Sequence, residues 1–455
     1  MRILGSKIMA TKITGDALES YLKCKTKAHL KLAGHQGSMS DYEGLLVASR
    51  QEVRRQAIAK ILAQHPETEV ARDIPLTAAA LRAGSSFVLD TTLEDDLLTL
   101  RFAGLKRVDG SSKLGDFHYV PMLFHEGRKV GKEQRLLLEL HGLILSQIQG
   151  RLPANGVVWH GRECKATRVR LNPDKRRAEQ FLQEVREMGS AESPTRLILN
   201  EHCQVCEFRQ RCHDQAVQED NISLIRGMSE RSIRKYQKKG ITTLSQLSCT
   251  FRPRKNNKRE VKNRRPHSFG LQALAVRDGR IYVYGTPDLP TSPVRIYLDV
   301  EGDPDRNFVY LIGLVIDEGG AERRHSFWAD DEAGEERIFR EFLDVVGSYE
   351  DFSLFFYGRY ETDYLNRMRG RSGSKRLINR LLDGSVNVLR AMYGKVYFPT
   401  YSNGLKDVAP ALGFSWTEKD ASGVQSLVWR HPGSGAAGRI LRASSWPTTS
   451  KTVSH

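Results

Sequence analysis

Hydrophobic positions along the chain follow two different periods, and together they predict a mixed α/β protein. Helical spacing is found over residues 14–32, 42–64 and 131–149, with Cys24 in the middle of the first segment and Asp16 as its expected N-cap. Strands are expected near 86–91, 97–103, 117–124, 156–160 and 165–171, followed by a charged helix near 174–188. These segments complete one α/β unit.

The second half of the chain repeats the mixture after a helical connection. Two short helices are expected within residues 222–248, with tight turns at Gly227 and Gly240. Strands are then expected near 281–285, 295–300 and 308–316, with another possible at 325–329, before a helix at about 333–346 and a strand from Phe352. The order of strand, hairpin, helix and strand, with acids at strand ends, is typical of an RNase H-like nuclease core.

Two carboxylates mark the end of one of these strands. Asp299 and Glu301 follow the apolar run Ile296-Tyr297-Leu298. Residues i and i+2 of a strand share a face, so the two acids would stand side by side. Repulsion between two adjacent carboxylates is unfavourable unless a cation lies between them. Hard divalent ions such as Mg²⁺ bind carboxylate oxygens in this way. The alternative is a surface strand whose acids only face solvent.

A second cluster contains cysteines. Cys203 and Cys206 form a C-x₂-C pair, and Cys212 follows it. Such a pair lets two thiolates reach one metal centre from a tight turn. A fourth ligand is needed, and Cys24 is the first candidate, with Cys164 as the alternative. Iron–sulfur and zinc sites both use four cysteines, so the spacing leaves the metal open.

Composition points to a polyanionic partner. The 455-residue chain has a formal net charge of +16, and nucleic acid is the simplest partner for that charge. No apolar run is long enough to span a bilayer. The start at Met1 lacks a long apolar segment with a cleavage site, so a cytoplasmic location is expected, and Met9 is an alternative start.

The most basic segment covers residues 251–266, and we expect it to be a linker that touches phosphate backbone. Its expected nucleic-acid contacts are Arg252, Arg254, Lys255, Lys258, Arg259, Lys262, Arg264 and Arg265. The preceding helices resemble a helix-hairpin-helix, a module that offers amides and basic side chains to phosphates without reading bases. An inert helical linker is the alternative.

Several longer stretches resemble one bacterial family. These are Tyr21–Cys24, Leu105–Gly110, Leu199–Arg209, Gly227–Ser229, Tyr297–Pro304, Phe327–Asp330 and Tyr397–Asp407. The chain up to about Arg430 is similar to RecB-like nucleases of the PD-(D/E)xK superfamily that carry an appended RNase H-like domain of the YprB type. The resemblance implies a RecB-like nuclease-fold domain over 9–218, a helix-hairpin-helix-like segment with basic linker over 219–270 and an RNase H-like domain over 271–430. Residues 431–455 would form an aberrant, disordered tail.

The same resemblance implies cofactors and site residues. Cys24, Cys203, Cys206 and Cys212 would hold a [4Fe–4S] cluster, with zinc as the less favoured occupant. Asp299 and Glu301 would be the first metal-binding pair of a DEDD-type 3′–5′ exonuclease site that uses Mg²⁺ or Mn²⁺. Glu361 would be the next acid, since it follows Tyr360 and precedes Leu365, and Asp363 is the alternative.

Two departures from the family pattern bear on activity. A PD-(D/E)xK site needs an acid and then a D/E-x-K strand. Asp109 or Asp116 could supply the acid, but the strand after them has neither acid nor lysine in place. We therefore expect a degenerate nuclease fold kept for DNA binding or as a structural body. A displaced lysine, Lys129 or Lys132, is the alternative.

The second departure concerns the C-terminal region. Similar proteins continue beyond Arg430 into a helix that supplies the last carboxylate, but here Asp420 is the last acid. A truncated or frameshifted reading frame would produce this pattern. The sequence thus predicts a nucleic-acid-binding nuclease acting on single-stranded DNA, DNA ends or RNA, with metal-dependent hydrolysis impaired by the missing acid. The alternative is a non-catalytic DNA-binding accessory protein.

Overall fold

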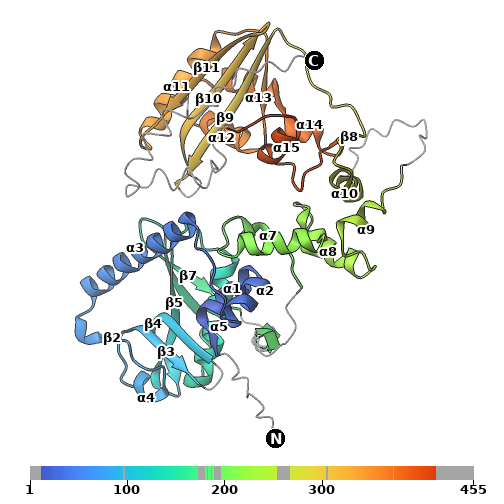
Figure 1. Ribbon diagram of the computed structural model, residues 1–455. Helices are drawn as coiled ribbons and strands as arrows, with labels where there is room; N and C mark the ends of the chain where they lie inside the picture. The colour runs from blue at the N-terminus through green and yellow to red at the C-terminus, as the bar shows by residue number, and fades with distance from the viewer. Residues whose placement is uncertain are drawn as a thin grey trace, which may run out of the picture. The chain divides into compact units, whose positions relative to one another are not determined.

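The computed structural model describes residues 12–95, 98–172, 180–181, 183–185, 187–188, 196–253, 267–303, 306–371 and 373–416. The chain divides into two compact units, Met1–Cys212 and His213–His455 (Figure 1). Within the described residues, no helix combines the length and the apolar character that crossing a membrane requires.

The first unit is built on one mixed sheet with the strand order β2-β3-β4-β5-β6-β7, and β1 pairs with β4. The strands are β1 (Ile13–Thr14), β2 (Val70–Arg72), β3 (Phe87–Glu94), β4 (Leu98–Ser112), β5 (Gly115–His125), β6 (Asn155–His160) and β7 (Lys165–Arg170). Strands β3, β4 and β5 are antiparallel neighbours, whereas β5 and β6 run parallel. The predicted strands of this half are therefore present.

Helices cover both faces of this sheet. They are α1 (Gly15–Lys23), α2 (Lys25–Leu32), α3 (Asp41–Gln64), α4 (Ala78–Leu81) and α5 (Lys132–Gln149), with a short 3₁₀ turn η1 (Glu67–Glu69). On one face Ile61 of α3 packs with Phe87, Leu89 and Met122. On the other face α1 and α5 pack on the apolar side chains of β4. Alternate strand residues are apolar on both sides, which is the pattern of a sheet buried between two helix layers.

The helix predicted over 14–32 is in fact two helices. Cys24 lies between α1 and α2 with extended backbone angles (φ −162°, ψ 120°), so the helix is interrupted at this cysteine. The N-cap is Thr14, whose side chain accepts from Ala17 N, and not the expected Asp16. Helical periodicity continues across the break, which is why the sequence pattern alone did not reveal it. Most of the charged helix expected at 174–188 lies outside the described residues.

Short helices connect the two sheets along the chain. They are η2 (Glu201–Gln204), α7 (Arg209–Gln218), η3 (Ile222–Leu224), α8 (Glu230–Gln237), α9 (Leu244–Ser248) and α10 (Phe269–Asp278). The turns expected at Gly227 and Gly240 are present, and both glycines have positive φ (82° and 76°). The small two-stranded sheet of β8 (Tyr282–Val283) and β14 (Val396–Tyr397) packs against α10.

The second unit contains a five-stranded sheet with the order β11-β10-β9-β12-β13. Its strands are β9 (Val294–Asp303), β10 (Phe308–Glu318), β11 (Ala321–Trp328), β12 (Phe352–Phe356) and β13 (Ser385–Asn387). The first three form an antiparallel meander, and β12 runs parallel to both β9 and β13. This is the predicted succession of strand, hairpin, helix and strand.

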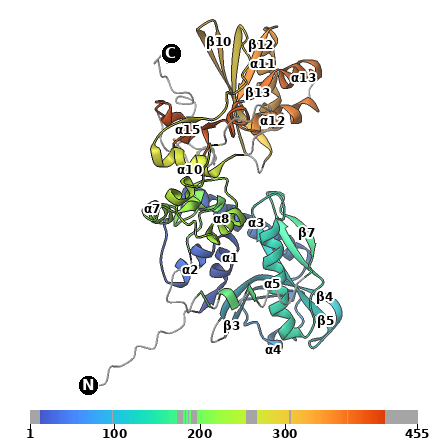
Figure 2. The same cartoon turned by 90° about the vertical axis from the view of Figure 1, so that its right-hand side faces the viewer.

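Three helices cover one face of that sheet. Apolar residues of α11 (Gly334–Gly347), α12 (Tyr360–Arg369) and α13 (Lys375–Asp383) share a core with β9 and β10. Figure 2 shows these three helices beside β10 and β12. On β9 the residues that face this core are Val294, Ile296, Leu298 and Val300. The alternate positions of β9, including Asp299, therefore face the other side of the sheet. The unit is completed by α14 (Val388–Met392) and α15 (Leu405–Ala411).

Candidate functional site

Asp299 and Glu301 lie near the end of β9, on the face turned away from the helical core. The Asp299 side chain is solvent-exposed and Glu301 is half-buried. Their partners on β10 are Gly313 and Leu311, and the pairing shifts by one residue between Val309 and Leu311. Such a bulge bends a strand and re-aims its side chains. The two acids thus share a face, as their spacing predicts.

Glu361 reaches the same region from α12. Strand β12 runs parallel to β9, with Phe355 opposite Tyr297, so both strands end at the same edge of the sheet. Helix α12 begins four residues after β12 and packs against β9. Glu361 lies in its first turn and is only 5% exposed. The connection after β12 therefore delivers a third carboxylate to the end of β9.

Asp363, the alternative to Glu361, has a different environment. Its side chain is exposed and pairs with Arg359 at 3.3 Å. Two residues along a helix rotate a side chain by about 200°, so the two acids cannot share a face of α12. The structure therefore brings Glu361, and not Asp363, to Asp299 and Glu301.

The electrostatics of the three acids show that they interact. Burial and, to a smaller extent, the neighbouring Asp299 raise the pKa of Glu301 to about 7, with Lys406 opposing the rise. Burial also raises the pKa of Glu361 to about 7, with Asp299 and Glu301 adding to the effect and a backbone hydrogen bond opposing it. The pKa of Asp299 is raised by desolvation, because the surrounding protein displaces water although the side chain reaches solvent. Carboxylates in mutual repulsion favour a bound cation.

One unpaired oxygen supports the same conclusion. Glu361 Oε2 is buried and has no hydrogen-bond partner among the described residues. An unsatisfied buried acceptor is unfavourable, and a cation would satisfy it. As placed, no three His, Cys, Asp or Glu side chains of the described residues converge closely enough to hold one metal ion. The donor set thus fits a hard divalent cation, but the side chains would have to move together to bind it.

Two residues near the acids, Lys406 and Gly302, were not predicted from the sequence to belong to the site. Lys406 lowers the pKa of Glu301, and its only signal was its place within the Tyr397–Asp407 stretch. Gly302 follows Glu301, and a Cβ there would lie 2.7 Å from the Phe308 carbonyl oxygen and would also meet the hydroxyl of Tyr360. Glycine is therefore required where the backbone passes under Tyr360.

Comparison with known proteins adds one finding for this half of the chain. Residues 296–432 match the family model of the RNase H superfamily. The chain contains an RNase H superfamily domain. This match indicates a nuclease-like activity on nucleic acid, and members of the superfamily typically use Mg²⁺ or Mn²⁺. No protein in a search of curated proteins matches the chain. The three acids all lie inside the matched range.

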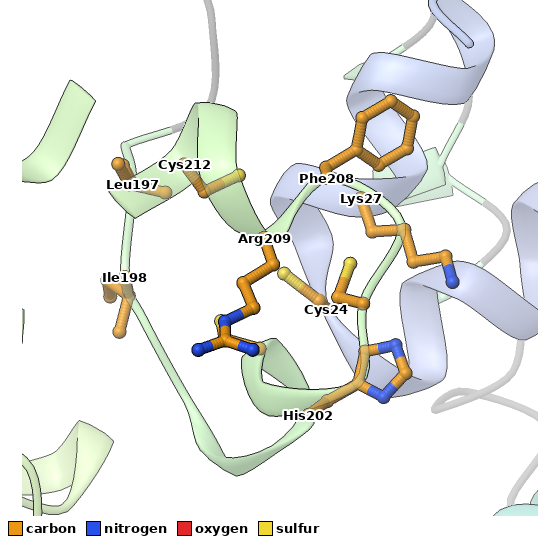
Figure 3. A pocket seen from close by; sticks show the side chains of 10 residues that line it. Cys24, Lys27, Leu197, Ile198, His202, Phe208, Arg209 and Cys212 are labelled. Carbon is orange, nitrogen blue, oxygen red and sulfur yellow. The ribbon is translucent and has the colours of Figure 1, made fainter. Parts of the chain in front are cut away.

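The four cysteines predicted to bind metal also come together, in the first unit. Cys24, Cys203, Cys206 and Cys212 line one pocket, with Lys27, His202 and Arg209 among its other lining residues (Figure 3). The interruption between α1 and α2 places Cys24 there, and Arg209 extends into the same pocket. None of the six cysteines, all of which the structure describes, forms a disulfide. Cys164 lies elsewhere, buried beside Val53.

The thiols influence one another. Burial raises the pKa of Cys212 to about 12, and Cys203, Cys24 and Cys206 add to this rise. Burial likewise raises the pKa of Cys206, while Lys27 opposes it. Grouped thiols of this kind ionise more readily when a metal centre accepts them. Four soft ligands from two segments fit an iron–sulfur cluster or a zinc ion chemically. In the part of the chain that the structure describes, however, no three such side chains are within reach of a single ion.

The residues considered for a second nuclease site in the first unit do not meet. Asp109 and Asp116 lie near the β4–β5 turn, whereas Lys129 and Lys132 lie beyond the other end of β5. The strand has 11 residues, which corresponds to about 36 Å of extended chain. Acid and lysine are therefore far apart, and the degenerate nuclease fold stays a prediction. Of the predicted basic contacts, Arg252 is described and the others lie outside the described residues.

Proposed function

We propose that the chain is a nucleic-acid-binding protein whose RNase H superfamily domain hydrolyses phosphodiester bonds in a metal-dependent, 3′–5′ exonuclease-like manner. The observation that carries the proposal is that Asp299 and Glu301 of β9 lie close enough to Glu361 of α12 to raise its pKa, inside the range that matches the superfamily. DNA ends, single-stranded DNA and RNA are the proposed substrates, because the net charge of +16 favours a polyanion.

The three acids would hold Mg²⁺ or Mn²⁺. A divalent ion in such a site supplies an activated water and stabilises charge on the leaving oxygen. The protein's own part is to present ionised carboxylates in a partly dehydrated place. Because burial raises the pKa values of Glu301 and Glu361 to about 7, both acids are largely protonated below neutral pH unless a cation is bound. Activity should therefore rise through pH 7.

The family resemblance implies a last acid beyond Arg430, and residues 421–455 contain no Asp or Glu. The last Asp or Glu of the sequence is Asp420, which lies outside the described residues. A DEDD-type site with three of its four acids would bind metal more weakly. We therefore propose impaired hydrolysis, with Mn²⁺ a better cofactor than Mg²⁺, because Mg²⁺ demands near-ideal octahedral geometry.

The test is nucleotide release from 3′-labelled single-stranded DNA and RNA with Mn²⁺. Glu361→Gln should abolish release, whereas Asp363→Asn, an exposed acid on the same helix, should leave it unchanged. Release that persists in an Asp299→Ala, Glu301→Ala double variant would refute the assignment of the site.

A non-catalytic accessory role is the second candidate. Two observations favour it. Among the described residues, no three acidic side chains lie close enough together to hold one metal ion. The segment 251–266 is strongly basic. An accessory role predicts salt-sensitive binding, with log Kd rising steeply with log salt, and no hydrolysis. Failure to bind DNA or RNA at moderate salt would exclude both candidates.

We also propose that the cysteine pocket holds a [4Fe–4S] cluster, and that the first unit is a RecB-like fold retained for binding. The support is the gathering of Cys24 with Cys203, Cys206 and Cys212 around one pocket. Such a cluster would link α1 and α2 to the segment that precedes α7. Anaerobically purified protein should be brown and contain iron; a colourless protein with bound zinc would indicate the alternative occupant, because Zn²⁺ is d¹⁰.

A further inference from the structure

A buried ion pair lies behind the carboxylate site. Glu335, in the first turn of α11, is 4% exposed. Its Oε1 accepts the Val309 backbone N–H at 2.7 Å. Val309 pairs with Gly302, the residue after Glu301, and the bulge of β10 begins at Val309. The Glu335 carboxylate is thus tied to the β10 backbone, opposite the residue of β9 that follows Glu301.

Arg367 of α12 completes the pair. Its guanidinium donates to both carboxylate oxygens of Glu335, at 2.5 and 2.9 Å, and its Nη1 also donates to the Asn307 carbonyl oxygen at 2.8 Å. The Arg367 side chain is 17% exposed and lies over the Tyr364 ring. A bidentate pair fixes the orientation of the guanidinium relative to the carboxylate as well as the distance between them. The pair therefore joins α11, α12 and the turn between β9 and β10.

The position of the pair along α12 determines what it can control. Arg367 is six residues from Glu361 on the same helix, so the two are separated by about 9 Å along the helix axis. The first turn of α12 contains Glu361, whose Oε2 has no partner among the described residues. The helix is thus held at its C-terminal half, while its N-terminal turn presents the acid to Asp299 and Glu301.

We propose that Glu335 and Arg367 are positioning residues that set the distance between Glu361 and the Asp299–Glu301 pair, and thereby the affinity for a divalent cation. The inference rests on the proposed metal site. Neither residue touches the cation; each acts through the placement of α12 against the end of β9. The pair would thus orient a metal-binding residue without touching the metal, as outer-shell hydrogen-bond partners do in other metal sites.

The experiment measures the Mn²⁺ Kd of the full chain by electron paramagnetic resonance. Arg367→Met should raise the Mn²⁺ Kd by about tenfold or more. Arg367→Lys keeps the positive charge but cannot form the bidentate contact, and it should also raise the Kd. Glu335→Gln should give an intermediate rise, since it retains the shape but not the charge. The melting temperature of each variant is recorded alongside.

Val346→Ala is the matched control for stability. Val346 is fully buried in the same core, about three turns from Glu335 along α11. It should lower the melting temperature and leave the Mn²⁺ Kd within about twofold. An unchanged Kd in both Arg367 variants, or an equal rise in Val346→Ala, overturns the positioning role while the metal site stands. If the wild-type chain binds no Mn²⁺, the proposed function fails and the inference with it.

Discussion

Glu361→Gln should stabilise the metal-free protein, although it removes a residue of the proposed site. The pKa of Glu361 is raised from 4.5 to about 7 by burial and by the neighbouring acids. At about 1.4 kcal/mol for each pKa unit, its ionisation costs the folded state about 3 kcal/mol at pH 8. Glutamine has nearly the same shape and no charge. The free energy of unfolding of the variant should therefore exceed that of the wild type by most of this amount.

The gain should depend on pH in a defined direction. Below pH 4.5 the carboxyl is protonated in both folded and unfolded chains, and the variant should equal the wild type. Between pH 4.5 and about 7 the unfolded chain releases its proton first, so the wild type becomes progressively less stable than the variant. Above pH 7 the difference should be constant.

The assay is urea unfolding at pH 5 and pH 8, with hydrogen exchange of β9 and α12 used to isolate this unit. Saturating Mn²⁺ should reverse the order, because it stabilises only the form that binds it. Asp363→Asn is the control: its acid is exposed and paired with Arg359, so it should change stability by less than about 1 kcal/mol. A Glu361→Gln variant no more stable than wild type at pH 8 without metal would refute the raised pKa of Glu361.

Other predictions test single features of the molecule. Gly302→Ala should destabilise by about 1–3 kcal/mol in chemical denaturation, because its Cβ would press on the Phe308 carbonyl oxygen; Gly373→Ala, with open space around it, should not. Cys24→Ser should lower the bound iron or zinc measured by elemental analysis, whereas Cys249→Ser, an exposed cysteine outside the pocket, should leave it unchanged. Replacing the basic residues of 251–266 with glutamine should reduce the slope of log Kd against log salt concentration for DNA binding. The expected reduction is about 0.9 for each phosphate that is no longer neutralised. An unchanged slope would show that this segment does not bind phosphate.

The two candidate sites differ in how their residues reach one another. The acid pair of β9 is local, and only Glu361 joins it from a distant element. The cysteine site depends on a contact between residue 24 and residues 203–212. Removing a long-range ligand should therefore loosen the first unit as well as the proposed metal site, since closing so long a loop is entropically costly without a bound centre.

Local patterns in the sequence determined a substantial part of this protein. Alternation of apolar residues predicted the strands of both sheets, and the i, i+2 spacing of Asp299 and Glu301 placed them on one face, because a strand repeats every two residues. The C-x₂-C pair likewise identified Cys203 and Cys206 as neighbours. These features depend only on backbone geometry within a few residues.

Tertiary structure decided the choices that the spacing left open. It brought Cys24 rather than Cys164 to the other cysteines, through a break in a helix that periodicity does not reveal. It also selected Glu361 over Asp363, because the parallel pairing of β12 with β9 determines where α12 begins and which of its faces is buried. The Glu335–Arg367 pair had no signal in the sequence at all. Contacts between distant segments arise from the packing of whole elements, and short-range spacing does not encode that packing.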